Sequence, residues 1–333
     1  MLSDKKIIVV GATGRVGREM LSILHERKIP HNNIGCAASS RSAGSYIAYG
    51  KEDQIIVQDI NSVDFSKYEI GLFSAGSEVS RIYAVKAAES KCVVIDNTSY
   101  FRMHDDISLI VPEINPEDYH RHTNKYIIAN PNCSTIQMVM VLKPLHDAFG
   151  LKEVVASTYQ AVSGAGQKGV EELHWQIKNL ENTPPSHFKK QIAFNVIPQI
   201  DVFTESLYTK EEEKMMNETR KILHLPKLDI TATCVRVPVD IGHSISVHAK
   251  FEKNVDILVA KEEIARFSGI TIIDDPEKYE YVTPIESVSK NEVYVSRIRK
   301  HQTIGNALSF WCVSDNLRKG AALNSVQIAE KML

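Results

Sequence analysis

Short apolar runs alternate with longer stretches of helical periodicity over the first third of the chain. The runs lie at 6–10, 34–38, 70–73, 93–96, 109–111 and 126–129. Between the first two runs, residues 15–28 place apolar side chains three and four positions apart, as on one face of a helix. This rhythm predicts a doubly wound, mostly parallel sheet of the α/β, Rossmann-like class.

The pattern changes after residue 149. Strands are expected at 153–162, 230–238, 244–251, 292–299 and 307–314, and helices at 164–181, 256–266 and 320–332. Strands that follow one another with fewer crossovers predict an α+β domain on a mainly antiparallel or mixed sheet. The 333 residues also favour two domains over one. We expect a first domain of residues 1–132, completed by a C-terminal helix of residues 314–333, and a second domain of 133–313.

One cysteine lies at the expected sequence boundary between the two domains, in "IIANPNCSTIQMVMVLKPL" (127–145). The apolar spacing that follows predicts an amphipathic helix, and Asn130, Pro131 and Asn132 are turn and capping residues. Cys133 would therefore lie at a helix N-terminus. The sequence leaves two interpretations open, a buried filler and a nucleophile.

A nucleophilic Cys133 would need help from its surroundings. A cysteine has a pKa of about 8.5, and lowering it by about 1.5 units takes roughly 2 kcal/mol. A helix terminus contributes about 0.3–1 kcal/mol, so a second cationic group is required. The best candidate is His243 in "VDIGHSISV", although spacing alone favours a solvated or structural histidine there. Arg236 interrupts an apolar strand and must pair with a protein carboxylate or an anionic substrate.

Composition narrows the class of partner. Apolar residues make up 43% and charged residues 24%, and 39 basic against 41 acidic residues give a net charge of −2. This balance favours a small-molecule partner over nucleic acid or an anionic membrane. We expect no signal peptide and no membrane span. The five cysteines have neither disulfide-framework nor zinc-ligand spacing, which predicts reduced thiols in the cytoplasm and no metal site.

A glycine-rich turn follows the first strand, in "VVGATGRVG" (9–17). Gly11, Gly14 and Gly17 have a spacing related to the dinucleotide fingerprint, in which glycines allow a pyrophosphate to approach the helix N-terminus. The alternative is a plain strand–turn–helix with glycines for packing. The strand before the turn and the helix after it favour the nucleotide site.

The end of the second strand indicates which nucleotide. An NAD site usually has a carboxylate there, whereas this chain has "AASSRSAG", with Ser39, Arg41 and Ser42. Because guanidinium and hydroxyl groups suit a 2′-phosphate, NADP is favoured over NAD. An exposed loop arginine without such a role is the alternative. The segment Phe73–Ser77 ("FSAGS") would line the same crevice.

Eleven motifs follow one another along the chain. In chain order they are "VVGATGRVG" (9–17), "ASSRSAG" (38–44), "LFSAGS" (72–77), "DNTSYFRM" (96–103), "VPEIN" (111–115), "NPNCSTIQM" (130–138), "STYQAVSGAG" (157–166), "IAFNVIPQIDVF" (192–203), "CVRVPV" with "GHS" (234–244), "SRIRK" (296–300) and "VSDNLRKGAALNSVQIAE" (313–330). Any one is moderately specific, and eleven in order are very specific. Together they resemble the aspartate-β-semialdehyde dehydrogenases, in the shorter bacterial branch.

The resemblance implies an activity. That family interconverts L-aspartyl 4-phosphate and L-aspartate 4-semialdehyde with NADP(H) and inorganic phosphate, in lysine (diaminopimelate), methionine, threonine and isoleucine biosynthesis. It also implies a homodimer built through the second domain. The connection between helix 164–181 and "IAFN" is shorter here than in many relatives, which bears on the dimer surface rather than on the chemistry.

The same resemblance assigns residue roles. Cys133 matches the nucleophile that forms an acyl-thioester, His243 the acid/base, and Gln160 the residue that orients the substrate. Arg236 and Glu211 match the pair that holds the α-carboxylate and the α-amino group. Among "EEEK", Glu211 is chosen because the family motif places glutamate three positions before its lysine.

The resemblance also implies phosphate and cofactor contacts. The phosphate-binding set comprises Arg102, Asn132 and Lys214. The expected NADP contacts are Gly11, Thr13, Gly14, Arg15, Val16, Ser39, Arg41, Ser42, Ser74, Ala75, Gly76, Ser163, Gly164 and Asn316.

Three rival functions remain to be separated. An N-acetyl-γ-glutamyl-phosphate reductase shares the thiol chemistry, but its substrate has no free amino group for Glu211 to bind. A cysteine hydrolase or acyltransferase would have no use for the glycine-rich turn. A catalytically silent NADP-binding regulator would have no use for the set of Cys133, Gln160, Arg236 and His243.

Overall fold

The computed structural model describes residues 1–121, 126–179 and 187–332. The chain divides into two compact units, which are described separately below. Unit 1 comprises Met1–Asn132 and Ala321–Leu333, and unit 2 comprises Cys133–Gly320. The segment of the C-terminus that belongs to unit 1 thus begins at Ala321 rather than at 314.

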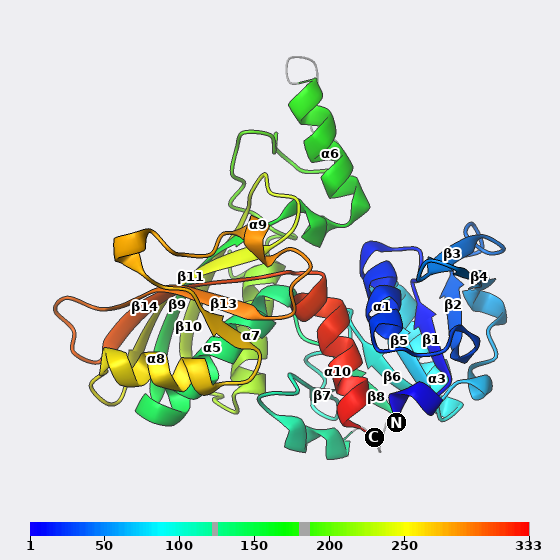
Figure 1. Ribbon diagram of the computed structural model, residues 1–333, viewed down its shortest axis with the longest axis horizontal. Coiled ribbons are helices and arrows are strands. Elements are labelled where there is room, and N and C mark those ends of the chain that lie inside the picture. Colours follow the sequence, from blue (N-terminus) through cyan, green and yellow to red (C-terminus); the bar gives the residue numbers. More distant parts are fainter. Residues whose placement is uncertain (122–125, 180–186, 333) are drawn as a thin grey trace. The chain divides into compact units, whose positions relative to one another are not determined.

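Unit 1 is built on an eight-stranded sheet with the strand order β3-β4-β2-β1-β5-β6-β8-β7 (Figure 1). The strands are β1 (Ile7–Val10), β2 (Ile34–Ala38), β3 (Tyr46–Tyr49), β4 (Asp53–Asp59), β5 (Ile70–Phe73), β6 (Val93–Asp96), β7 (Ser108–Leu109) and β8 (Ile127–Ala129). All neighbours are parallel except β3 and β4, which form an antiparallel hairpin. The predicted doubly wound, mostly parallel sheet is confirmed.

The sequence pattern did not predict β3 and β4. Their side chains alternate between exposed and buried, unlike the fully buried β1, β2 and β5. An edge hairpin with one solvated face lacks the continuous apolar run by which the central strands were identified. The turn between them contains Gly50 at φ +70°, in the left-handed region that favours glycine.

The helices of unit 1 are α1 (Arg15–Glu26), α2 (Ser77–Val79), α3 (Val85–Glu89) and α10 (Leu323–Lys331), with a π-helical turn at Ser80–Ala84 that joins α2 to α3. Helices α1 and α10 pack against each other and on the central strands. Their buried residues Met20, Leu24, Val326 and Ile328 join the strand residues in one apolar core. The C-terminal helix therefore completes the first unit.

Unit 2 contains a six-stranded mixed sheet with the order β10-β9-β11-β14-β13-β12. The strands are β9 (Leu151–Gln160), β10 (Asp229–Arg236), β11 (His243–Phe251), β12 (Ile270–Ile272), β13 (Val293–Lys300) and β14 (Ala307–Ser314). Pairs β9–β10 and β12–β13 are parallel and the other three pairs are antiparallel. The predicted mixed sheet is confirmed, although the short edge strand β12 was not anticipated.

The helices of unit 2 are α5 (Cys133–Phe149), α6 (Gln167–Lys178), α7 (Lys210–Ile222), α8 (Ile257–Arg266) and α9 (Pro284–Ser287). The prediction that α5 is amphipathic is wrong, because every residue from Ser134 to Leu142 is buried. The sheet covers one side of α5 while α7 and α8 cover the other (Figure 1). Helix α6 is shorter than the predicted 164–181: residues 162–165 form a 3₁₀ turn, and the predicted end lies outside the described residues.

No helix in the described parts of the chain is long and apolar enough to cross a membrane. Those same residues contain no group of three or more metal-ligating side chains that could hold an ion.

Candidate active site

Cys133 is the first residue of α5 and is partly exposed, while Asn130, Pro131 and Asn132 before it are buried. Gly320 lies close to it. A Cβ on residue 320 would lie 2.9 Å from the Cβ of Cys133 and 3.3 Å from its Cα. Gly320 therefore leaves the room that the cysteine occupies. Gly320 could not be predicted as a site residue, because nothing in its local pattern indicates a neighbour so far away in the chain.

His243 is the first residue of β11 and is fully buried. Its Nδ1 accepts a hydrogen bond of 3.0 Å from the backbone N–H of Ala161. In the neutral ring the proton must then be on Nε2, which has no hydrogen-bond partner among the described residues. Burial, reinforced by the nearby Arg236 charge, lowers the pKa of His243 from 6.5 to about 3.

This result contradicts the expected imidazolium beside the thiol. The ring is neutral, and its Nε2–H is a donor rather than a positive charge. The error has a physical reason: a histidine at the start of a central strand loses its hydration, which opposes protonation. The cation required to stabilise a Cys133 thiolate must therefore come from another residue.

Arg236, the last residue of β10, provides a cation that interacts electrostatically with Cys133. It is buried, and its Nη1 donates a 2.7 Å hydrogen bond to the carbonyl oxygen of Ala161. Burial lowers the pKa of Arg236, whereas the negative charges of Glu211 and Cys133 act to raise it. The guanidinium therefore interacts electrostatically with both the carboxylate and the cysteine sulfur. Glu211 is thus the protein carboxylate that could pair with this strand arginine, and an anionic substrate as its partner stays a prediction.

Arg236 and His243 converge on Gly164. A Cβ on residue 164 would lie 2.9 Å from Nη1 of Arg236 and 3.1 Å from Nε2 of His243. The guanidinium and the imidazole N–H thus face one small space, which glycine leaves open. The resemblance assigned Gly164 to the cofactor, but its nearest side chains are these two polar groups.

Gln160 and Glu211 form the acidic side of the same cluster. Gln160 ends β9, and its register partner Arg236 ends the adjacent parallel strand β10, so both lie at one sheet edge. Nε2 of Gln160 donates a hydrogen bond of 3.2 Å to Oε1 of Glu211. Glu211 is buried in the first turn of α7, where Thr209 and Glu212 form a capping box.

The composition of the charged stretch 209–222, taken alone, predicts a solvated helix face. The structure contradicts this, because Glu211, Glu212 and Glu218 are buried. Glu212 reaches back to the N-cap and also accepts a hydrogen bond from the backbone of Cys234 on β10. A charged helix can bury its carboxylates where caps and strand amides satisfy them.

Lys214 connects two carboxylates of unit 2. Its Nζ lies 3.2 Å from Oε2 of Glu211 and 2.9 Å from Oδ2 of Asp201. Although partial burial acts to raise the pKa of Asp201, its bond to Lys214 lowers that pKa overall. Sequence reasoning did not identify Asp201, which lies in a segment without regular structure.

Arg102 and Asn132 are buried residues of unit 1. Nη2 of Arg102 donates a 2.8 Å hydrogen bond to the carbonyl oxygen of Asn97. The structure therefore gathers Gln160, Glu211, Lys214, Arg236 and His243 in unit 2, which begins at Cys133, and holds the other two expected phosphate residues in unit 1.

A pocket of about 440 Å³ in unit 1 is lined by seven of the fourteen residues predicted to contact NADP. The lining comprises Val10, Gly11, Thr13, Gly14, Ala38, Ser39, Arg41, Ile60, Ser74, Ala75 and Val79. Gly11 is required there, because it has φ +85° and a Cβ would lie 2.3 Å from the carbonyl oxygen of Ser74. An open glycine turn before α1, with Arg41 at the same pocket, fits a phosphorylated dinucleotide.

Other expected cofactor residues lie elsewhere. Four of them are chain neighbours of the pocket residues without lining the pocket: Arg15, Val16, Ser42 and Gly76. Ser163 and Asn316 belong to unit 2 and hydrogen-bond each other at 3.0 Å. Oδ1 of Asn316 also accepts from the backbone of Gly242, next to His243.

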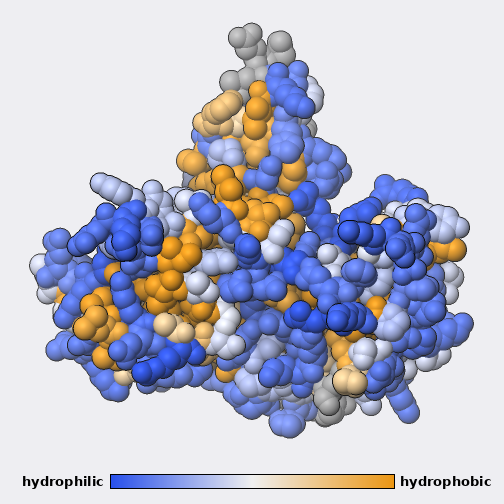
Figure 2. All heavy atoms as spheres, viewed as in Figure 1, coloured by the Kyte–Doolittle hydropathy of each residue, from blue (hydrophilic) through white to orange (hydrophobic). Residues whose placement is uncertain are grey.

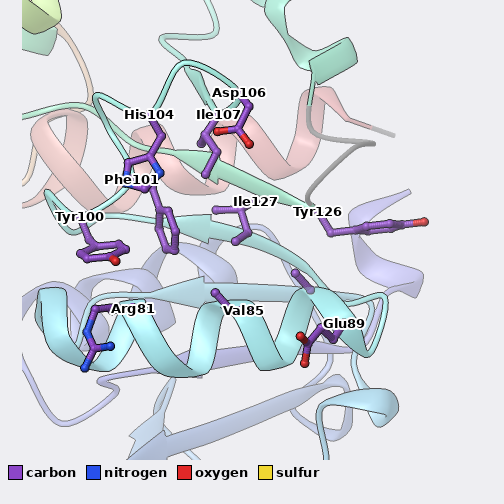
Figure 3. Close-up of a pocket in the computed structure, with 11 residues that line it drawn as sticks. Arg81, Val85, Glu89, Tyr100, Phe101, His104, Asp106, Ile107, Tyr126 and Ile127 are labelled. Carbon is purple, nitrogen blue, oxygen red and sulfur yellow. The ribbon is translucent and has the colours of Figure 1, made fainter.

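A second pocket in unit 1, of about 500 Å³, was not predicted (Figure 3). Val85 projects from α3 toward Tyr100, Phe101 and His104, whose three rings contact one another. Phe101 directly precedes Arg102 in the chain. The aromatic packing therefore fixes one side of the turn that carries Arg102.

Two family models match this chain. The semialdehyde dehydrogenase NAD binding domain matches residues 6–122, and the semialdehyde dehydrogenase dimerisation domain matches residues 142–319. The chain belongs to the semialdehyde dehydrogenase family. Proteins named aspartate-semialdehyde dehydrogenase are similar over nearly the full length of both chains. The one from Aquifex aeolicus is 48% identical over 98% of each chain. The one from Bacillus subtilis is 46% identical, covering 98% of this chain and 96% of its own.

Solved structures agree with this family assignment. The aspartate semialdehyde dehydrogenase II of Vibrio cholerae, complexed with ASA, is 42% identical and superposes with a TM-score of 0.94 over 98% of this chain and 97% of its own. A probable aspartate-semialdehyde dehydrogenase from Pseudomonas aeruginosa is 29% identical, with a TM-score of 0.90 over 97% of each chain. The resemblance noted in the sequence and the expected fold class are confirmed.

Proposed function

We propose that this semialdehyde dehydrogenase converts L-aspartyl 4-phosphate and NADPH into L-aspartate 4-semialdehyde, phosphate and NADP through an acyl-thioester on Cys133. The observation that carries the proposal is the cluster of Gln160, Glu211, Arg236 and His243 at one sheet edge of the unit that Cys133 begins. It offers one buried cation and one buried anion, as a substrate with an α-carboxylate and an α-ammonium requires.

The substrate is held by complementary charges. Arg236 binds the α-carboxylate, and Glu211 binds the α-ammonium group. Because both side chains are buried, a substrate that lacks its α-carboxylate or its α-ammonium group would lose a charged hydrogen bond to Arg236 or to Glu211. Gln160 bonds Glu211 and orients it. Because Glu211 binds an ammonium group, an N-acetylated substrate, which has none, is disfavoured.

In the first step the Cys133 sulfur attacks the acyl carbon. The carbon–oxygen bond to phosphate breaks, and the phosphate takes the bonding electron pair and the thiol proton. The Arg236 charge and the first-turn amides of α5 favour the thiolate that attacks. Arg102, Asn132 and Lys214 bind the phosphate. The covalent thioester divides one difficult step into two easier ones.

The second step reduces the thioester and releases the Cys133 thiolate. NADPH, when bound, supplies the hydride that reduces the thioester carbonyl. The resulting oxyanion expels the Cys133 thiolate and gives the aldehyde, and the thiolate recovers a proton from solvent. The Nε2–H of His243 donates a hydrogen bond to the carbonyl oxygen as negative charge develops on it.

The 440 Å³ pocket of unit 1 holds the cofactor. The turn at Gly11, Thr13 and Gly14 receives the pyrophosphate. Arg41, with Ser39 and Ser42, receives the 2′-phosphate, which selects NADP over NAD. The resemblance also assigns Ser163, Gly164 and Asn316 to NADP contacts.

The chain forms a homodimer through unit 2. Large apolar side chains are strongly exposed there: Trp175, Ile177, Phe194, Val196, Phe203 and Leu207. Figure 2 shows hydrophobic residues gathered around and below α6, on the face in view. A patch of this kind marks a protein interface.

The reaction needs a reduced thiol, which supports a location in the cytoplasm. Its product, L-aspartate 4-semialdehyde, serves the synthesis of lysine, methionine, threonine and isoleucine.

One assay tests the activity. Purified protein is mixed with L-aspartate 4-semialdehyde, phosphate and NADP, and the nicotinamide absorbance is followed. Parallel mixtures replace the aldehyde with N-acetyl-L-glutamate 5-semialdehyde, or NADP with NAD. We expect rapid reduction of NADP with the aspartate aldehyde only, and only with phosphate present. Preference for the N-acetylated aldehyde would contradict the proposed role of Glu211.

A further inference from the structure

Three asparagine side chains of unit 1, from well-separated parts of the sequence, form one hydrogen-bonded chain. Nδ2 of Asn324 donates to Oδ1 of Asn130 at 2.7 Å, and Nδ2 of Asn130 donates to Oδ1 of Asn97 at 2.7 Å. Nδ2 of Asn97 points to Oγ of Ser74, at 3.4 Å. Asn130 and Asn324 are fully buried. We name the side chains of Asn97, Asn130 and Asn324 the amide chain.

The amide chain lies where two strands end. Asn97 directly follows β6, and Asn130 directly follows its parallel neighbour β8, so their side chains meet at one edge of the sheet. The backbone N–H of Asn130 also donates to the carbonyl oxygen of Asp96 at 2.8 Å. Asn324 approaches from the first turn of α10 and donates a second bond to the carbonyl oxygen of Ile110.

The amide chain ends at the backbone that binds Arg102. The carbonyl oxygen of Asn97 accepts the 2.8 Å hydrogen bond from Nη2 of Arg102. The peptide around Asn97 is fixed from its other side as well. The buried carboxylate of Asp96 accepts hydrogen bonds from the hydroxyls of Ser80 and Thr98 and from the backbone N–H of Thr98. The orientation of the Arg102 guanidinium therefore depends on a peptide held by buried polar side chains.

Stability alone is a weak explanation for this arrangement. Buried amide groups gain little net stability over well-packed apolar side chains, because their desolvation opposes their hydrogen bonds. What a satisfied polar network does provide is a unique geometry. The geometry fixed here is that of the carbonyl oxygen which orients Arg102.

We propose that Asn130 and Asn324 are positioning residues for phosphate: through Asn97 they hold the Arg102 guanidinium in the orientation that binds the phosphate group. The inference rests on the proposed function, in which Arg102 contacts phosphate. The C-terminal helix thus acts on phosphate affinity through residues that do not contact the substrate.

The test compares Asn324→Ser and Asn130→Ser with the control Asn115→Ser in the full-length enzyme. Asn115 is also a buried asparagine of unit 1 with several hydrogen bonds, but its partners are Leu109, Val111 and Asp118. The KM values for phosphate, aldehyde and NADP, kcat and the melting temperature are measured for each variant.

We expect both test variants to raise the phosphate KM about three- to tenfold, the usual effect of one lost hydrogen bond, with smaller changes in the other KM values. The control should lower the melting temperature without this selective effect. Should Asn130→Ser fail to fold, Asn324→Ser alone decides.

A double-mutant cycle with Arg102→Leu separates the inference from the proposed function. If Asn324 acts through Arg102, adding Asn324→Ser to Arg102→Leu changes the phosphate KM no further, which supports the inference. Additive effects, or equal changes in every KM value, overturn it while leaving Arg102 in its role. An unchanged phosphate KM in Arg102→Leu alone removes the phosphate assignment of Arg102, and the inference with it.

Discussion

The backbone N–H of Ala161 donates a hydrogen bond to Nδ1 of His243, with 3.0 Å between the two nitrogens. The carbonyl oxygen of the same residue accepts from Arg236 at 2.7 Å. One residue of the main chain therefore orients both the imidazole and the guanidinium. Protonation of Nδ1 would replace the acceptor of that bond with a second donor. The ring is held neutral by this contact as well as by its burial.

The low pKa of His243 predicts a dependence of stability on pH. An unfolded histidine binds a proton as the pH falls through 6.5, whereas the folded one does so only near its pKa of about 3. Between these values the unfolded state binds more protons, so stability is full above 6.5 and is lost as the pH falls. His243→Gln should reduce this loss, by up to about 1.4 kcal/mol per pH unit.

Urea unfolding at about pH 7 and about pH 5 checks this prediction. The free energy of unfolding should decrease less in His243→Gln than in the natural protein. His120→Gln, which changes an exposed histidine, is the control. Parallel decreases in the natural protein and in His243→Gln would mean that the folded His243 titrates normally.

The apolar runs and turn residues were enough to predict the central strands and the start of α5 at Cys133, because these features are local. The neutral state of His243 could not be predicted. It depends on the Ala161 peptide, 82 positions away in the chain, and on complete burial. Sequence spacing reveals that a histidine is present but not its hydration.

The acidic cluster illustrates the same limit. Composition indicates a solvated helix at 209–222. In the structure Glu211 is buried, next to the capping box at Thr209, and accepts a hydrogen bond from Gln160. Asp201 and Gly320 carried no motif of their own, and only the fold brings them beside Lys214 and Cys133. Residues that leave space for another side chain or compensate its charge can be identified only once the fold shows which residues lie next to them.

Replacing Cys133, the proposed nucleophile, should separate chemistry from cofactor binding. Cys133→Ser should lose essentially all turnover, because a serine hydroxyl is a much weaker nucleophile at neutral pH than a thiolate. NADP binding, measured by fluorescence titration, should be unchanged, since the 440 Å³ pocket does not include Cys133. Appreciable turnover in this variant would rule out the covalent thioester.

The charge of Arg41 should determine cofactor preference. In Arg41→Asp, a carboxylate replaces the guanidinium at the dinucleotide pocket and would repel a 2′-phosphate. We expect the KM for NADP to rise about tenfold or more, with little change or a decrease for NAD. The check is kcat/KM with each nucleotide. An unaltered NADP/NAD ratio would place the 2′-phosphate elsewhere.

Among the KM values, Arg236 should act mainly on that of the amino-acid substrate. Arg236→Leu removes the buried cation, and we expect the KM for the aldehyde to rise about 10- to 100-fold, the effect of a lost charged hydrogen bond. The KM for phosphate should change much less. Arg236→Lys keeps the charge without the planar fork and should recover part of the loss. Equal changes in both KM values would reassign this arginine.

The space in front of Gly164 should be occupied by substrate during turnover. In Gly164→Ala the new methyl group would approach Nη1 of Arg236 to 2.9 Å and Nε2 of His243 to 3.1 Å. The substrate would then meet displaced polar groups, and a small misplacement of such groups costs about 100-fold in rate. We therefore expect kcat/KM for the aldehyde to fall 10- to 100-fold, with little change in melting temperature. Gly305→Ala, whose methyl group would meet only Asn254, is the matched control. Full activity in Gly164→Ala would show that the reacting carbonyl binds away from the Arg236–His243 space.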